Sequence, residues 1–253
     1  MKIKQVGNHI PSKSLLWRYF DFQKFLSLVI EQSLFFNRMD RMEDANEGIS
    51  INQLLLRYGN EIEKEIAKKS KKQSGRKELH LKTRQQKYFL SCWLIHHRES
   101  VAMWNSYSNS DGIALKIDAN KLIASITENS SAMNDAEKMK TMYHGGIVYK
   151  DFFNPKDRKG FKEEIDIIGF QKDESFAHEK EYRFLIKQDI HNYKEDDVEF
   201  VKLKLNDFSK LKFDLVFHPK MESWKKENIK SVLTSLKAKN FTPKDSELKL
   251  KEW

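Results

Sequence analysis

Apolar and polar positions alternate along the chain in a way that predicts a succession of strands and helices. Short apolar or alternating runs predict strands over residues 14–21, 34–37, 88–95, 111–118, 145–152, 175–186, 198–205 and 213–219. Helical spacing predicts helices over residues 21–33, 50–72, 99–108 and 223–239, a mixture of helix and loop at 119–142, and a helix or an extended lead-in at 160–172. Because helices interrupt the strands irregularly, we expect an α+β fold with a mixed or antiparallel central sheet and helical insertions.

One predicted strand has an unusual polar face. In "SFAHEKEYRFLI" (175–186), Glu179, Glu181 and Arg183 occupy alternate positions. Alternate side chains of a strand share a face and lie about 6.6 Å apart, at about 3.3 Å per residue. The opposite face carries three residues expected in a core, Tyr182, Phe184 and Ile186. The two acids and the arginine therefore form either a functional site or salt bridges to neighbouring strands.

Composition limits the domain organisation. The chain has 253 residues, of which 39% are hydrophobic, and its 17 Phe can fill a substantial core. No linker rich in Gly, Ser or Pro is visible, so we expect one domain over residues 1–253. Within it, we expect a basic helical insertion at about 50–87 and a charged C-terminal tail at about 240–253.

Charge and cysteine content bear on location and partners. A formal net charge of +9 would attract a polyanion such as nucleic acid, although lysine-rich stretches also serve solubility alone. The single cysteine, Cys92, excludes an intramolecular disulfide, fits a reducing compartment, and is expected to be buried and inert in its aromatic strand. With no signal peptide or membrane span visible, we expect a cytoplasmic protein that does not enter a membrane. The oligomeric state stays open.

The common catalytic and ligand-binding motifs do not occur. There is no HExxH sequence or cysteine pair for zinc, no glycine-rich phosphate loop and no GxSxG turn, so we expect no metal site. The unusual polar residues lie instead at the end of the first strand, in a polar loop, in an apolar strand and around the "EKEYR" segment. In that order they are Arg18 and Tyr19; Asp44 and Glu47; Ser91; and Lys172, Glu179, Glu181 and Arg183.

Several segments, taken in order, resemble a bacterial family known as domain of unknown function 2971. They are "LWRYF", "LFFNRMDRMEDANEG", "FLSCWLIHHRESVAMWNSYSNSDGIALKID", "GIVYKD" and "FQKDESFAHEKEYRF". The positions that match its motifs are Met103, Trp104, Tyr107 and Gly112, and then Lys172, Glu179, Glu181, Tyr182 and Arg183. The chain departs from the family at "MEDANEG", which keeps Asp44 and Glu47 but lacks the family's proline.

The order of an early arginine, a middle serine and a late Glu-x-Glu is also similar to the Arg–Ser–Glu pattern of ADP-ribosyltransferases. This resemblance implies an ADP-ribosyltransferase-like fold. It also implies that Arg18 contacts NAD phosphate, Ser91 supports the nicotinamide ribose, Glu181 stabilises an oxocarbenium-like centre and Glu179 helps to set the acceptor. The residues expected to contact NAD, the substrate, are Arg18, Tyr19, Ser91, Trp104 and Tyr107, with Trp93 as a further ring for stacking.

Three functions follow as alternatives. The first is an NAD-consuming, ADP-ribosyltransferase-like effector of a toxin or phage-defence system, with a protein or nucleic acid as acceptor. The second is a non-catalytic binding or sensor module with a basic surface, in which the charged strand is a structural network. The third is a nuclease that holds Mg²⁺ through four acidic residues, Asp44, Glu47, Glu179 and Glu181.

Overall fold

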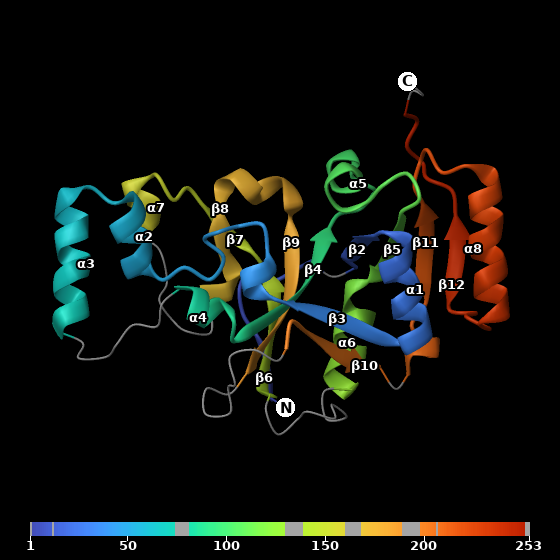
Figure 1. Cartoon of the computed structure of the whole chain (residues 1–253), viewed down its shortest axis with the longest axis horizontal. Helices are drawn as coiled ribbons and strands as arrows, with labels where there is room; N and C mark the ends of the chain where they lie inside the picture. The colour runs from blue at the N-terminus through green and yellow to red at the C-terminus, as the bar shows by residue number, and fades with distance from the viewer. Residues whose placement is uncertain are drawn as a thin grey trace. The chain divides into compact units, whose positions relative to one another are not determined.

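The chain forms two compact units, each assembled from three separate segments. The computed structural model describes residues 2–11, 13–73, 81–129, 139–159, 168–188, 198–205 and 207–250 (Figure 1). Unit 1 comprises Met1–His9, Phe36–Ser91 and Asp135–Val201; unit 2 comprises Ile10–Phe35, Cys92–Asn134 and Lys202–Trp253. That the whole chain behaves as one domain stays a prediction.

Unit 1 is built from strands with short helices around them. Its strands are β1 (Lys2–Gln5), β6 (Met139–Gly146), β7 (Val148–Lys150), β8 (Gln171–Asp173) and β9 (Glu181–Gln188), together with parts of β3 (Ser33–Arg38), β4 (Tyr88–Ile95) and β10 (Phe200–Lys204). Its helices are η1 (Met39–Arg41), α2 (Ile51–Tyr58), α3 (Glu61–Gln73), α4 (Leu81–Gln85), α7 (Pro155–Lys159), η2 (Ile168–Phe170) and η3 (Glu174–Glu179).

The sheet of unit 1 is mixed. Its strand order is β1-β6-β9-β4, with β1 parallel to β6 and β6 antiparallel to β9. Strands β7 and β8 form a separate parallel pair. In Figure 1, α2, α3 and α7 lie together, and α2 contacts both of the other helices.

The helix predicted over residues 50–72 is two helices. Ser50 caps α2 with a capping box to Gln53, and α2 ends at Gly59, whose N–H donates to the carbonyl of Leu55. Asn60 then accepts from the N–H of Glu63, whose carboxylate accepts from the N–H of Asn60, both at 2.9 Å. This reciprocal pair starts a new helix, so the break follows from local sequence signals.

The strand predicted over residues 145–152 is also divided, between β6 and β7. The chain of β6 passes against the N-terminal segment at Gly145 and Gly146. A Cβ atom added to Gly145 would lie 1.5 Å from the carbonyl oxygen of Val6. Only glycine permits this close backbone approach, which fixes where β6 ends.

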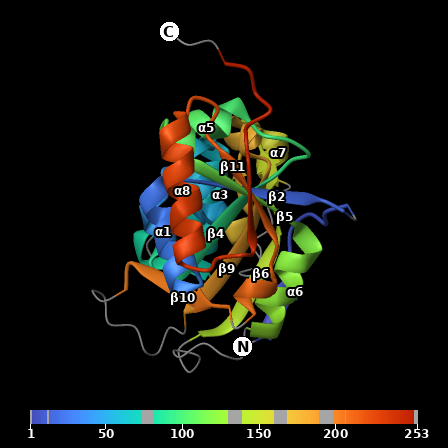
Figure 2. The same cartoon turned by 90° about the vertical axis from the view of Figure 1, so that its right-hand side faces the viewer.

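Unit 2 contains the strands and helices that remain. They are β2 (Leu15–Phe20), α1 (Phe22–Glu31), α5 (Val101–Tyr107), β5 (Ile113–Asp118), α6 (Ala119–Asn129), η5 (Phe208–Lys210), β11 (Phe213–Phe217), α8 (Ser223–Ser235) and β12 (Phe241–Lys244), with the remaining parts of β3, β4 and β10. The strand order is β4-β2-β5-β11-β12, antiparallel except for the parallel pair β11 and β12. Figure 2 shows α1 and α6 on opposite sides of these strands, where α1 contacts β2 and α6 contacts β5.

An aromatic cluster forms part of the core of unit 2. We define the aromatic cluster by its buried members, Trp17, Tyr19, Leu94, Met103, Trp104, Ala114 and Val216. They come from β2, β4, α5, β5 and β11, so this cluster joins the sheet to the helix beside it. At the start of α1, Asp21 accepts from the N–H of Lys24 at 2.8 Å, as expected of an N-cap.

Helices and a mixed sheet together confirm the α+β prediction in its general form. Strands β1 and β12 were not predicted, and β12 lies in the segment predicted to be a charged tail. The basic loop around residues 74 and 75 and most of the segment 160–172 lie outside the described residues. Within the described part of the chain, no helix has the length and apolar character needed to cross a membrane.

Candidate functional site

Arg183 is the centre of a buried charged cluster in unit 1. Its guanidinium pairs with both oxygens of Glu181 (Nε to Oε1, 2.7 Å; Nη2 to Oε2, 2.8 Å) and with both oxygens of Glu47 (Nη1 to Oε1, 2.6 Å; Nη2 to Oε2, 3.2 Å). Nη1 also donates to the carbonyl of Gly169 at 2.7 Å. A guanidinium has five N–H donors, so these contacts account for all of them. Arg183 and Glu47 are completely buried.

Lys172 extends the cluster from β8. Its Nζ lies 2.6 Å from a Glu179 oxygen and 3.7 Å from a Glu181 oxygen, and sits 4.3 Å from the ring centroid of Phe176. Burial alone would lower the pKa of Lys172, but nearby Glu181, Glu47 and Glu179 outweigh it and raise that pKa. Lys172 therefore stays protonated and links the two glutamates predicted from the "EKEYR" segment.

Glu179 and Glu181 do not lie on one strand as predicted. Glu179 ends η3, Lys180 adopts a left-handed conformation (φ 40°), and β9 begins at Glu181. The N–H of Glu181 donates to the Tyr149 hydroxyl at 2.9 Å, and its carbonyl accepts from Ile147. The two acids thus approach Lys172 from either side of a turn, not from one face of a strand.

A turn between β3 and α2 supplies the remaining acids. Asp44 accepts from the N–H of Asn46 through Oδ1 at 2.8 Å, and its carbonyl accepts from the N–H of Glu47. Gln85 donates to the carbonyl of Glu47 at 2.8 Å, and Gly48 follows with φ 68°. These contacts fix the turn, although the proline typical of the family is missing. The Oδ2 atom of Asp44 is buried without a hydrogen-bond partner.

The cluster holds more acids than bases. Its members are Asp44, Glu47, Glu179 and Glu181 against Lys172 and Arg183, and all six are buried. Burial raises the pKa of Asp44 and of Glu47, with Lys172 and Arg183 opposing the shift in both cases. Two negative charges would be uncompensated if all six groups were ionised, so the site can retain a proton or stabilise a positive charge.

Tyr149 was not predicted and lies beside the cluster. Burial raises the pKa of its phenol, and the charges of Glu181 and Glu179 act in the same direction. The hydroxyl therefore keeps its proton at neutral pH while it accepts from the Glu181 N–H. Tyr149 lies in the "GIVYKD" segment, but its contact is with Glu181 at the start of β9, 32 residues later in the chain, so no local pattern indicates it.

The other predicted residues are divided between the units. Ser91 is in unit 1 and completely buried, whereas Arg18 is in unit 2. The Arg18 guanidinium donates to the Phe35 carbonyl at 3.2 Å and lies near the Phe20 and Trp93 rings, 5.2 and 5.6 Å from their centroids. Burial lowers the pKa of Arg18 to about 10. That Arg18, Ser91 and Glu181 line one cleft stays a prediction.

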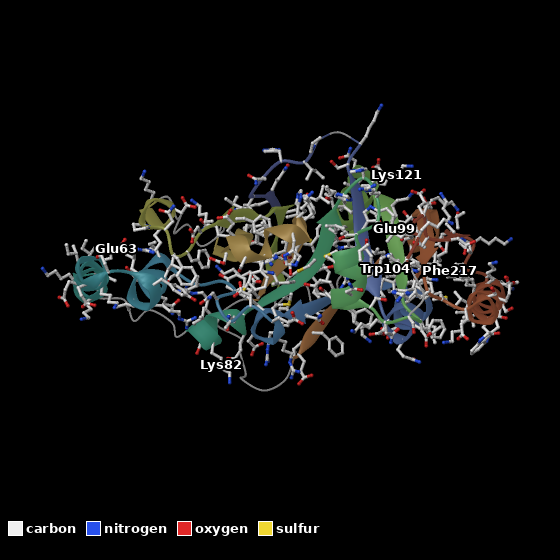
Figure 3. All side chains as sticks on the ribbon, turned by 90° about the horizontal axis from the view of Figure 1, so that it is seen from above. Glu63, Lys82, Glu99, Trp104, Lys121 and Phe217 are labelled. Atoms are coloured by element: carbon white, nitrogen blue, oxygen red, sulfur yellow. The ribbon has the colours of Figure 1, made fainter. Side chains whose placement is uncertain are left out.

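The predicted stacking residues Tyr19 and Trp104 belong to the aromatic cluster. Their rings meet edge to face with centroids 4.8 Å apart, and Trp104 is completely buried. The Trp104 indole N–H donates to Glu99 at 3.0 Å (both labelled in Figure 3). Tyr107 is the exposed member of the predicted set. Glu99 was not predicted, because its buried position depends on contacts far along the chain.

Three further features of the described chain bear on its chemistry: potential metal ligands, Cys92 and His144. There, no group of three or more His, Cys, Asp or Glu side chains could hold a metal ion. Cys92 is half-buried, less buried than its aromatic strand predicted. His144 is buried, with Nδ1 2.7 Å from the Tyr182 hydroxyl.

Comparisons with known proteins bear on the segment that carries these motifs. No curated protein and no solved structure matches the chain. A family model described as "Protein of unknown function (DUF2971)" matches residues 103–184. This stretch contains both groups of motif residues, from Met103 to Gly112 and from Lys172 to Arg183. The resemblance to the DUF2971 family is therefore confirmed over residues 103–184.

Proposed function

We propose that the chain is an NAD-consuming enzyme of the ADP-ribosyltransferase type, with Glu181 as its central catalytic residue. The observation that supports the proposal is the buried cluster, in which Arg183 holds both Glu181 oxygens and acids outnumber bases. A carboxylate held in this way keeps its position and orientation when charge develops nearby. A fixed charge of this kind stabilises a transition state without reorganising first.

The chemistry requires a site that favours positive charge. When the bond between nicotinamide and ribose breaks, its electron pair leaves with nicotinamide, and positive charge develops on the ribose carbon. A neighbouring carboxylate stabilises that transition state more than it stabilises the ground state. A new bond then forms between this carbon and an oxygen or nitrogen of the acceptor, which releases a proton. In the proposal, Glu181 faces the developing charge and Glu179 receives the proton of the acceptor.

Lys172 and Arg183 act in the proposal as positioning residues. Lys172 bridges Glu179 and Glu181 and keeps the two carboxylates at a fixed separation. Arg18 would bind a phosphate of NAD through its guanidinium, and Tyr19 and Tyr107 would contact the rings of NAD. Ser91 and Trp104 are completely buried, so they would reach the ribose and the rings only after a rearrangement. These assignments depend on the resemblance in residue order.

The test is NAD turnover by the purified chain, measured as nicotinamide release and as transfer of labelled ADP-ribose to proteins and nucleic acids of a cell extract. We expect Glu181→Gln to reduce turnover by about 10²–10³-fold, as loss of one stabilising group does in other active sites. Glu174→Gln is the matched control, because Glu174 is an exposed carboxylate in η3 of the same segment. Absence of any turnover, with no protection of the chain by NAD against heat, refutes the proposal.

One observation favours a second candidate, a non-catalytic binding module. The contacts of Arg183 use all five guanidinium N–H donors within unit 1, which is how a purely structural ion network is built. In that case Glu181→Gln lowers stability, while the wild-type chain binds a partner and consumes no NAD. Thermal unfolding of the wild type and Glu181→Gln beside the turnover assay separates the two candidates.

A further inference from the structure

The C-terminal segment of unit 2 is attached to the aromatic cluster through one buried carboxylate. After β12 ends at Lys244, residues 245–250 adopt no regular secondary structure. Glu99 accepts from the Ser246 hydroxyl at 2.6 Å and from the Glu247 N–H at 2.7 Å. The same carboxylate accepts from the Trp104 indole at 3.0 Å. Glu99 therefore joins this segment to the cluster.

The two sides of the segment are anchored differently. Leu248 packs against the aromatic cluster, and its N–H donates to the Ser246 hydroxyl at 3.1 Å. Asp245 is largely exposed and forms an ion pair with Lys226 of α8 at 2.7 Å. An exposed pair of this kind adds little to stability, whereas hydrogen bonds to a buried carboxylate are among the stronger ones. The contacts of Glu99 and Leu248 therefore dominate the attachment.

We propose that residues 245–250 form a strap that detaches from the aromatic cluster as a whole, and that the hydrogen bonds to Glu99 hold it closed. The strap supplies an N–H and an O–H donor to a carboxylate that would otherwise be buried beside Trp104 without them. When the strap opens, Glu99 gains access to water, so opening does not strand a buried charge. Segments that lack ladder hydrogen bonds open more readily than the sheets they cover.

Opening changes what unit 2 exposes. When the strap opens, Leu248 leaves the aromatic cluster, which contains Tyr19 and Trp104, two of the residues expected to contact NAD. It also frees an acceptor that accommodates an N–H and an O–H of an extended peptide. The closed strap is thus an intramolecular cover over an apolar surface, filled by the chain's own C-terminal segment. This inference depends on unit 2 alone and holds whether or not the chain consumes NAD.

Hydrogen exchange of the full chain, resolved to single amides, tests the strap. In the wild type, we expect the Glu247 amide to exchange at least about tenfold faster than the Phe213 amide, which donates to Asn240 beside the β11–β12 pair. Glu99→Ala should accelerate exchange at Glu247 by about tenfold or more, because a charge-assisted hydrogen bond is lost. Exchange at Phe213 should stay within about twofold of wild type.

Two further variants keep the test decisive. Leu248→Ala removes the apolar contact of a partly buried side chain, so it should leave the fold intact and still accelerate exchange at Glu247. Asp111→Asn is the control, because Asp111 pairs with Lys225 and makes none of the strap contacts described above. Equal exchange at Glu247 and Phe213 in every protein would show that the segment opens only with the whole unit. Exchange at Glu247 that neither variant changes would also overturn the proposal.

Discussion

Replacing Arg183 by methionine should be among the most damaging single changes in unit 1. Arg183 is completely buried and pairs with both Glu47 and Glu181, so the variant leaves two buried carboxylates without its guanidinium. Removing one partner of a buried ion pair costs about 3–5 kcal/mol. A folded chain has a total stability of only about 5–15 kcal/mol. We therefore expect the urea midpoint of Arg183→Met to fall by about a fifth or more.

A double-mutant cycle assigns the loss to the ion pair. Glu47→Gln keeps the shape of the side chain and removes its charge, and the two substitutions together leave no unpaired carboxylate at position 47. We expect the double variant to be more stable than the sum of the single losses predicts, by about 0.5–3 kcal/mol, the usual coupling energy of contacting residues. Urea unfolding followed by circular dichroism measures all four proteins.

The pH dependence provides an independent check on the same reasoning. Burial raises the pKa of Glu47 and Arg183 opposes this shift, so loss of the guanidinium should raise the pKa of Glu47 further in the folded variant. The folded variant then binds protons that its unfolded chain releases, so its stability increases as the pH falls from 8 to 5. The difference in unfolding free energy between wild type and Arg183→Met should therefore decrease as the pH falls over this range. A loss below about 1 kcal/mol, or a difference that is constant with pH, would refute the reasoning.

Three other predictions concern the fold. Asp21→Ala removes the acceptor of the Lys24 N–H and should cost about 1 kcal/mol in urea unfolding, whereas Asp21→Asn should cost much less. Gly145→Ala places a Cβ against the carbonyl of Val6 and should lower stability by about 1–3 kcal/mol or more; a neutral effect would contradict this close approach. Burial lowers the pKa of His144 below its ordinary value near 6.5, so below that pH the unfolded chain binds a proton that the folded chain does not. The difference in unfolding free energy between wild type and His144→Asn should decrease as the pH falls below about 6.5. A difference that stays constant with pH would contradict a lowered pKa of His144 in the folded chain.

Local sequence signals predicted much of the fold, because they describe what each segment does on its own. Strands β2 and β4 lie where continuous apolar runs placed them, and Asp21 caps α1 as expected. Strands β1 and β12 are short and carry polar residues, so their pairing with β6 and β11 leaves little trace in their own sequence. The break between α2 and α3 was predictable from Gly59 and the Asn60–Glu63 capping pair.

The candidate site was predictable in its residue types but not in its contacts. The alternating acids and arginine indicated a special segment, and the structure brings Glu179, Glu181 and Arg183 together with Lys172. The second acid that Arg183 contacts, Glu47, is 136 residues away in the sequence, and no local pattern encodes such a contact. The left-handed backbone conformation of Lys180 was also not predictable from the sequence, because lysine has no preference for that conformation.

Differences in exposure within the charged cluster suggest how its two possible roles can be separated. Glu47 and Arg183 are completely inaccessible, whereas Glu179 and Glu181 retain exposed fractions of 7% and 5%. A group with no access to solvent cannot touch a substrate without rearrangement, so the inner pair can act only through the residues it holds. If the cluster is catalytic, Glu47→Gln should change stability more than turnover per folded molecule, and Glu179→Gln should change turnover more than stability. If it is structural, both substitutions should change stability alone, in proportion to the hydrogen bonds each removes.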